Sequence, residues 1–170
     1  MLNKNFKINT AEQKEYKLIP EDMYQVKISN IKEVEQQVYN NPSEKEVVIN
    51  FEFTIIENGE FKGEKLYKKI RPIYSEGFSG GSPSSLFVLL NAVYYGKVPS
   101  GELVDVVNGT LGKQVRVVVK HKQSSKDGKT YHNVEDFMKS KGDIEYKEPD
   151  FDEIPEINLE EDINTGENPF

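Results

Sequence analysis

Four residues within positions 64–74 have the types and the spacing to hold a nucleic-acid strand. If this stretch is a β-strand, successive side chains point to opposite faces, so alternate residues share one face. One face then carries three cations and one aromatic ring: Lys65, Tyr67, Lys69 and Arg71. Cations pair with phosphates and a flat ring stacks on a base, which is how single strands are held without sequence preference. The alternative is an edge strand whose lysines only discourage edge-to-edge pairing.

Further cations and tyrosines extend this pattern. Residues 114–122 alternate valines with polar residues, which predicts a strand with a valine face and a basic face. The stretch 123–130 contains Ser-Ser-Lys-Asp-Gly-Lys and predicts a flexible basic hairpin loop. The alternative is that the basic face of the strand at 114–122 contacts only solvent. The additional candidates for phosphate contact or base stacking are Arg116, Lys120, Lys122, Lys126, Lys129, Tyr131 and Tyr39.

The charge is distributed unevenly along the chain. The net charge is −7, but residues 143–170 hold 11 acids and one lysine, a balance of −10. Residues 61–132 hold 12 bases and 5 acids, a balance of +7. A basic middle tied to an acidic tail predicts a polyanionic partner for the body, an interaction tail, or both.

The composition narrows the function classes. There is no cysteine, so disulfides, thiolate metal sites and a cysteine nucleophile are excluded, and a reducing cytoplasm is the expected compartment. No signal peptide is expected at the start, and the longest apolar run, 86–90, is far too short to span a bilayer. The only histidines, His121 and His132, lack the spacing of a metal motif, no phosphate loop occurs, and the stretch Gly-Phe-Ser-Gly-Gly at 77–81 is interpreted as a flexible loop. We therefore expect a protein without enzymatic activity, cofactor, metal or membrane contact.

The hydrophobic pattern predicts the elements that would position these residues. Period-two patterns predict five strands, with a bulge near Asn30 and a tight turn at Asn58-Gly59. Phe51 and Phe53 share a face with three aliphatic residues and are expected in the core. A helix should start at Ser82-Pro83, and a second short helical turn could follow at 102–107. The expected strands are 23–34, 47–56, 61–73, 114–122 and 131–138.

The element order resembles that of the OB-fold, a five-stranded barrel with one helix between strands 3 and 4. In that fold the face of strands 2 and 3 and the loops 1–2 and 4–5 bind oligonucleotides. The basic aromatic face falls on the third strand here, and the basic loop falls between strands four and five. We expect an arm at 1–19, a nucleic-acid-binding domain at 20–142 and a disordered acidic tail at 143–170.

The chain also resembles phage-encoded single-stranded-DNA-binding proteins, over roughly residues 20–138. The residues that carry this resemblance are Phe-Lys-Gly-Glu-Lys-Leu-Tyr at 61–67, Leu-Phe-Val-Leu-Leu-Asn-Ala at 86–92 and Leu-Gly-Lys-Gln-Val at 111–115. The tail looks like the acidic tip of bacterial and phage single-strand-binding proteins, which ends in acids, Pro and Phe. The matching positions are Asp162, Glu167, Pro169 and Phe170.

The resemblance implies sequence-nonspecific coating of single-stranded DNA in phage replication or recombination, with partner proteins recruited through the tail. The charge balance adds a further hypothesis, that the tail lies on the basic body when DNA is absent. The alternative is a protein–protein adaptor whose acidic tail docks a partner and whose body has no affinity for nucleic acid.

Overall fold

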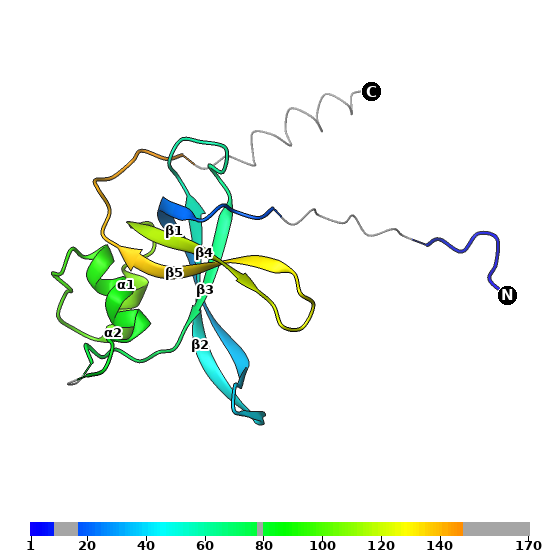
Figure 1. Cartoon of the computed structure of the whole chain (residues 1–170), viewed down its shortest axis with the longest axis horizontal. Coiled ribbons are helices and arrows are strands. Elements are labelled where there is room, and N and C mark those ends of the chain that lie inside the picture. Colours follow the sequence, from blue (N-terminus) through cyan, green and yellow to red (C-terminus); the bar gives the residue numbers. More distant parts are fainter. Residues whose placement is uncertain (9–16, 78–79, 148–170) are drawn as a thin grey trace, which may run out of the picture.

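The body of the protein is one antiparallel sheet with two helices gathered at one side of it, seen in the computed structural model in Figure 1. The structure describes residues 1–8, 17–77 and 80–147. The predicted tail residues Asp162, Glu167, Pro169 and Phe170 lie outside the described residues. Within the described ranges, no helix combines the length and the apolar character needed to cross a membrane.

Five strands form the sheet in the order β3-β2-β1-β4-β5, and every neighbouring pair is antiparallel. The mainly β class and the number of strands are therefore confirmed. The expected barrel is wrong, because the sheet is not closed: β3 and β5 approach each other but are not neighbours in the hydrogen-bonded order. The strands are β1 (Asp22–Val38), β2 (Asn41–Ile55), β3 (Lys65–Ile70), β4 (Gln114–Gln123) and β5 (Thr130–Met138).

Two helices, rather than the single helix of the expected fold class, connect β3 to β4 in the described chain. α1 (Ser85–Val93) packs against β4 and β5, and α2 (Leu103–Asn108) follows after a short connection. The cap of α1 is Ser84 rather than Ser82, since the Ser84 Oγ accepts a hydrogen bond from the Phe87 N–H at 3.2 Å. α2 lies where the sequence suggested a second short helical turn, at 102–107.

The core lies between the sheet and α1. The inner faces of β1 to β4 contribute every second residue, as period two requires, whereas a register shift in the β4–β5 ladder places the buried Val134 and Phe137 three positions apart. Phe51 and Phe53 are fully buried with their rings stacked, which confirms their core assignment. The bulge near Asn30 is also confirmed, because the register of β1 against β2 shifts between Ile28 and Asn30.

The two connections around β2 differ from the prediction. β1 and β2 run on as a ladder to a turn at Tyr39 and Asn40, so most of the stretch between the expected strands 23–34 and 47–56 is strand. The tight turn predicted at Asn58-Gly59 is wrong: a longer connection leads to β3 and is closed where the Gly63 N–H donates to the Ile55 carbonyl at 2.7 Å. Gly63 has φ +92, a conformation that favours glycine.

Both ends of the described body are held by hydrogen bonds. Ile19 is buried, its N–H donates to His132 Nδ1 at 3.1 Å, and its carbonyl lies 2.8 Å from His121 Nε2. At the other end the Ile144 N–H donates to Gln114 Oε1 at 2.8 Å, so the packed chain continues past the predicted boundary at 142.

Candidate nucleic-acid interface

The outer face of β2 and β3 brings three of the predicted residues together. Lys65, Tyr67 and Lys69 alternate on β3 with the buried Leu66 and the inner residue Lys68, and all three are exposed. The Tyr67 side chain is 57% exposed, so its ring is open to a stacking partner. We call this surface the outer face, defined by Lys65, Tyr67 and Lys69 of β3, Asn50, Glu52 and Thr54 of β2, and Lys32 of β1.

A polar network anchored by Glu52 fixes the first half of the outer face. The Lys65 ammonium donates to Thr54 Oγ1 at 2.6 Å, Thr54 donates to Ser29 Oγ at 2.9 Å, and Ser29 donates to Glu52 Oε1 at 2.8 Å. The Tyr67 hydroxyl donates to Glu52 Oε2 at 3.3 Å. Burial, followed by the charge of Glu52, raises the pKa of Tyr67, so the phenol stays protonated. The network sets the direction of the ring at its hydroxyl end and leaves the ring exposed.

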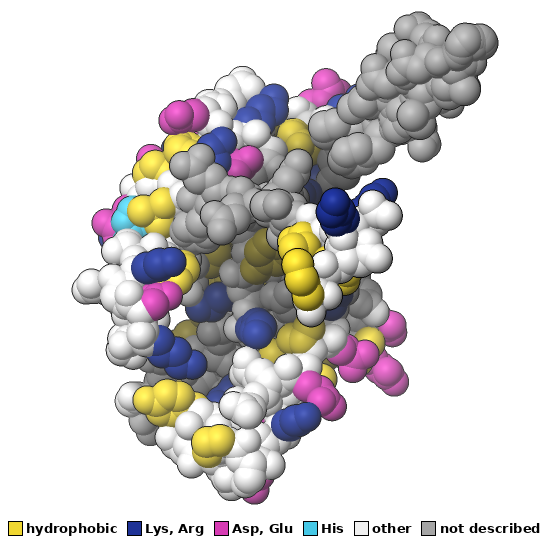
Figure 2. Space-filling view, turned by 90° about the vertical axis from the view of Figure 1, so that its right-hand side faces the viewer, with side chains coloured by type: hydrophobic (Ala, Val, Ile, Leu, Met, Phe, Trp, Pro, Cys, Tyr) yellow, Lys and Arg dark blue, Asp and Glu magenta, His cyan; other side chains and the backbone are white. Residues whose placement is uncertain are grey.

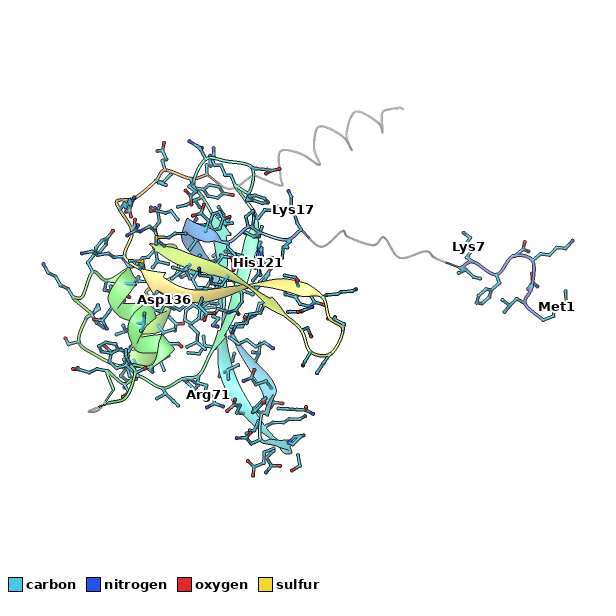
Figure 3. The ribbon with its side chains drawn as sticks, viewed as in Figure 1. Met1, Lys7, Lys17, Arg71, His121 and Asp136 are labelled. Atoms are coloured by element: carbon cyan, nitrogen blue, oxygen red, sulfur yellow. The ribbon has the colours of Figure 1, made fainter. Side chains whose placement is uncertain are left out.

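The second half of the outer face is a cross-strand row of two cations around an amide. Lys32 of β1 lies opposite Asn50 of β2, and Asn50 lies opposite Lys69 of β3. Neither lysine has an ion pair among the described residues. Arg71 continues the same side beyond the end of β3, where its Nε lies 3.4 Å from Glu46 Oε1 (Figure 3). This half is therefore the one best able to meet phosphates.

The β4–β5 hairpin supplies a second basic surface. Lys120 and Lys122 are exposed on the polar side of β4, and the Lys122 ammonium lies 3.8 Å from Glu135. The loop cations Lys126 and Lys129 are exposed. The Tyr131 hydroxyl donates to Asp127 at 2.6 Å, and this bond is the main reason that the pKa of Asp127 is lowered. Tyr131 is thereby tied to its own loop.

Lys68 is a candidate that the sequence pattern missed. It lies half-buried on the inner face of β3, between Leu66 and Ile70. Burial is the main reason that the pKa of Lys68 is lowered, the charge of Lys122 lowers it further, and Glu135 opposes both. Lys68 therefore faces the β4–β5 hairpin and links the two basic surfaces. The only sequence signal for Lys68 was its place in a short edge strand that is rich in lysine and tyrosine.

Two predicted residues lie apart from both surfaces. The Arg116 guanidinium is half-buried and donates to the Lys139 carbonyl at 2.8 Å, so it holds the chain after β5. Tyr39 lies at the tip of the β1–β2 hairpin, almost fully exposed. The structure thus separates a cluster on β3, a cluster on the β4–β5 hairpin and these two outlying positions.

Figure 2 views the side of the molecule away from the helices. Several Lys and Arg side chains gather around a hollow in the middle of this side, while most Asp and Glu side chains lie toward its margins. His121 and His132 lie opposite each other on β4 and β5, and both hydrogen-bond the backbone of Ile19. In the described part of the chain, no three His, Asp or Glu side chains gather as metal ligands would.

The fold and the site define a class of small β-sheet proteins with a basic, ring-bearing strand face. Residues 5–147 match the model of a family described as "Protein of unknown function (DUF669)", and the chain belongs to this family. The match ends where the strongly acidic part of the tail begins. No curated protein matches the chain.

Proposed function

We propose that this protein binds single-stranded DNA without marked sequence preference, along the outer face of β2 and β3 and the β4–β5 hairpin. The observation that carries the proposal is the exposed Tyr67 ring between Lys65 and Lys69 on one strand. Base stacking on such a ring is worth roughly 1–3 kcal/mol and tolerates any base.

The geometry suggests which residues stack on a base and which contact phosphates. Tyr67 stacks on a base, held in direction by its bond to Glu52. Lys69 and Lys32 contact phosphates on the side away from Glu52, because a carboxylate repels the backbone. The β4–β5 hairpin, with Lys68 and Lys122 near each other, carries the strand onward.

We infer that the arrangement is an open relative of the OB-fold. The sheet order, the β3–β5 approach and a helix between β3 and β4 favour this, and an OB-fold binds oligonucleotides at these same places. The acidic tail serves to recruit replication or recombination proteins, because an aromatic ring flanked by acids suits an apolar pocket with a basic rim. A phage origin would place the protein in the cytoplasm of the host.

The test is the binding of labelled oligo-dT to the full chain by fluorescence anisotropy at low and high salt, with unlabelled duplex DNA as competitor. We expect binding that weakens with salt and resists the duplex, because charge and stacking act together on a single strand. The adaptor alternative predicts no binding at either salt concentration, and a preference for duplex would also contradict the proposal.

A further inference from the structure

An apolar groove lies on the inner side of the β1–β2 hairpin, against the helical segment. It has a volume of about 510 Å³, and Val47, Leu103 and Val104 on its walls are 43–68% exposed. Apolar side chains that gather in one concave surface mark an interaction site more often than scattered ones do. The groove is lined mainly by Ile31, Val47, Ile49, Tyr74, Leu103 and Val104.

The groove adjoins a strand edge that has no partner. β3 pairs only with Ile49–Thr54 of β2 and then leaves the sheet, since Pro72 has no N–H to continue the ladder. On the side away from β1, residues 41–48 of β2 are therefore unpaired within the described chain. Val47 and Val48 belong both to this edge and to the groove. An extended segment could add to the edge and place its side chains in the groove.

The N-terminal arm has the side chains that such a groove would take. Residues 1–8 lie away from the body, with Met1 and Lys7 at a distance from every strand (Figures 1 and 3). Leu2, Phe6 and Ile8 are 57–74% exposed. Phe6 and Ile8 are two residues apart, so they share one face when the chain is extended. Neither the arm nor the groove is covered by any described segment of the same molecule.

The charges of the arm and of the groove walls are complementary. The arm carries Lys4 and Lys7 and no acid. The charged residues that line the groove, Lys32 and Glu33, balance each other, and the helical segment beside it, 98–110, holds Glu102 and Asp105 and no base. A segment of charge +2 is thus matched by a balance of −2 at the groove and its helical side, which steers the encounter and selects the arm over an acidic segment.

We propose that residues 1–8 of one molecule dock in the groove of a second copy, as an extended segment beside residues 41–48 of β2. The contact joins two different surfaces, so it is heterologous and can link copies in a chain or close them in a ring. It leaves Tyr67 and Lys69 of the outer face open, because neither lines the groove, and of the outer-face residues Lys32 belongs to both surfaces. The proposal does not depend on nucleic-acid binding.

The test is sedimentation velocity of the full chain over a range of concentrations, at low salt and without DNA. Association should grow with concentration, and both Phe6→Asp and Val104→Asp should abolish it. The matched control is Leu111→Asp, at an exposed leucine just after α2 that does not line the groove. Circular dichroism confirms that each variant is folded, as expected for changes at exposed positions.

A mixture of the two defective variants distinguishes exchange between copies from other contacts. Phe6→Asp keeps an intact groove and Val104→Asp keeps an intact arm, so an equal mixture should form pairs and nothing larger. Lys4→Glu with Lys7→Glu should weaken association, and Glu102→Lys with Asp105→Lys should restore it. A monomer at every concentration, association unaffected by Phe6→Asp, or a mixture that forms no pairs would overturn the proposal.

Discussion

The two faces of the β1–β2 hairpin carry different chemistry, although the same two strands form both. Lys32, Asn50 and Glu52 point outward and continue the basic face of β3. Ile31, Val47 and Ile49 line the apolar groove on the inner side. The hairpin extends beyond β3, so part of its inner face has no core to cover. Period two then gives one pair of strands two separate surfaces for binding.

Among the changes that test the difference between the two faces, Tyr67→Ala should have the largest effect on binding of oligo-dT. Loss of one stacking platform should weaken binding of oligo-dT by about 5- to 150-fold at high salt, where phosphate contacts are screened. Fluorescence anisotropy measures this. Tyr67→Phe is the control, because it keeps the ring and loses only the bond to Glu52. Self-association should be unchanged, and equal affinities for both variants and the wild type would remove Tyr67 from the interface.

Removal of the acidic tail should have the next largest effect, confined to low salt. Residues 148–170 hold nine acids and no base, and a truncation after Lys147 keeps the hydrogen bonds of Ile144 to Gln114. If the tail competes for the basic face, the truncated chain should bind oligo-dT several-fold more tightly at low salt and equally at high salt. An identical salt dependence for both chains would contradict this role.

Lys69→Ala and Lys32→Ala should change the salt dependence more than the affinity. Each lost phosphate contact should reduce the slope of log affinity against log salt by about 0.7 for a single strand. The measurement is a salt titration of oligo-dT binding. Lys97→Ala, an exposed lysine near the helices, is the control with the same change of charge. If all three variants lower the slope alike, the cations of the outer face have no special role.

Glu52→Gln should have a smaller effect in the opposite direction. It removes a negative charge beside the proposed path of the strand and keeps an oxygen to accept from Ser29. Binding should tighten by less than about fivefold at low salt, since exposed charge interactions are worth under ~1 kcal/mol. Glu135→Gln beside Lys122 offers the same comparison on the hairpin. Weaker binding by Glu52→Gln would mean that the direction of the Tyr67 ring matters more than the charge.

The smallest effect is expected from His132, which accepts a hydrogen bond from the Ile19 N–H, and it concerns the free energy of unfolding. Burial, followed by the charge of His121, lowers the pKa of His132 below its usual 6.5. As pH falls below 6.5, the unfolded chain takes up the proton first, so the free energy of unfolding should decrease until the lowered pKa is reached. His132→Asn should flatten this dependence in urea unfolding. An equally steep pH dependence in His132→Asn would contradict this role of His132.

The sequence predicted the strands and the outer face well because both depend on period two. Alternation placed Lys65, Tyr67 and Lys69 outward and Phe51 and Phe53 in the core. It could not predict closure, which depends on where β3 ends relative to β5. The polar stretch between the expected strands 23–34 and 47–56 is mostly strand, with an irregularity at 42–44 where the partner of Gln37 is Lys45 and that of Val38 is Asn41. The part of the hairpin that extends beyond β3 covers no core, so its strands are rich in polar residues and resemble a loop in the sequence. The groove that this part forms could therefore not be predicted.

The most direct test of the interface is hydrogen exchange of the full chain with and without saturating oligo-dT. We expect oligo-dT to slow exchange in Lys65–Ile70 and in the β4–β5 hairpin. Exchange in Leu103–Asn108, beside the groove, should be unchanged. Protection limited to the groove, or no protection in β3, would contradict the assignment of nucleic-acid binding to the outer face.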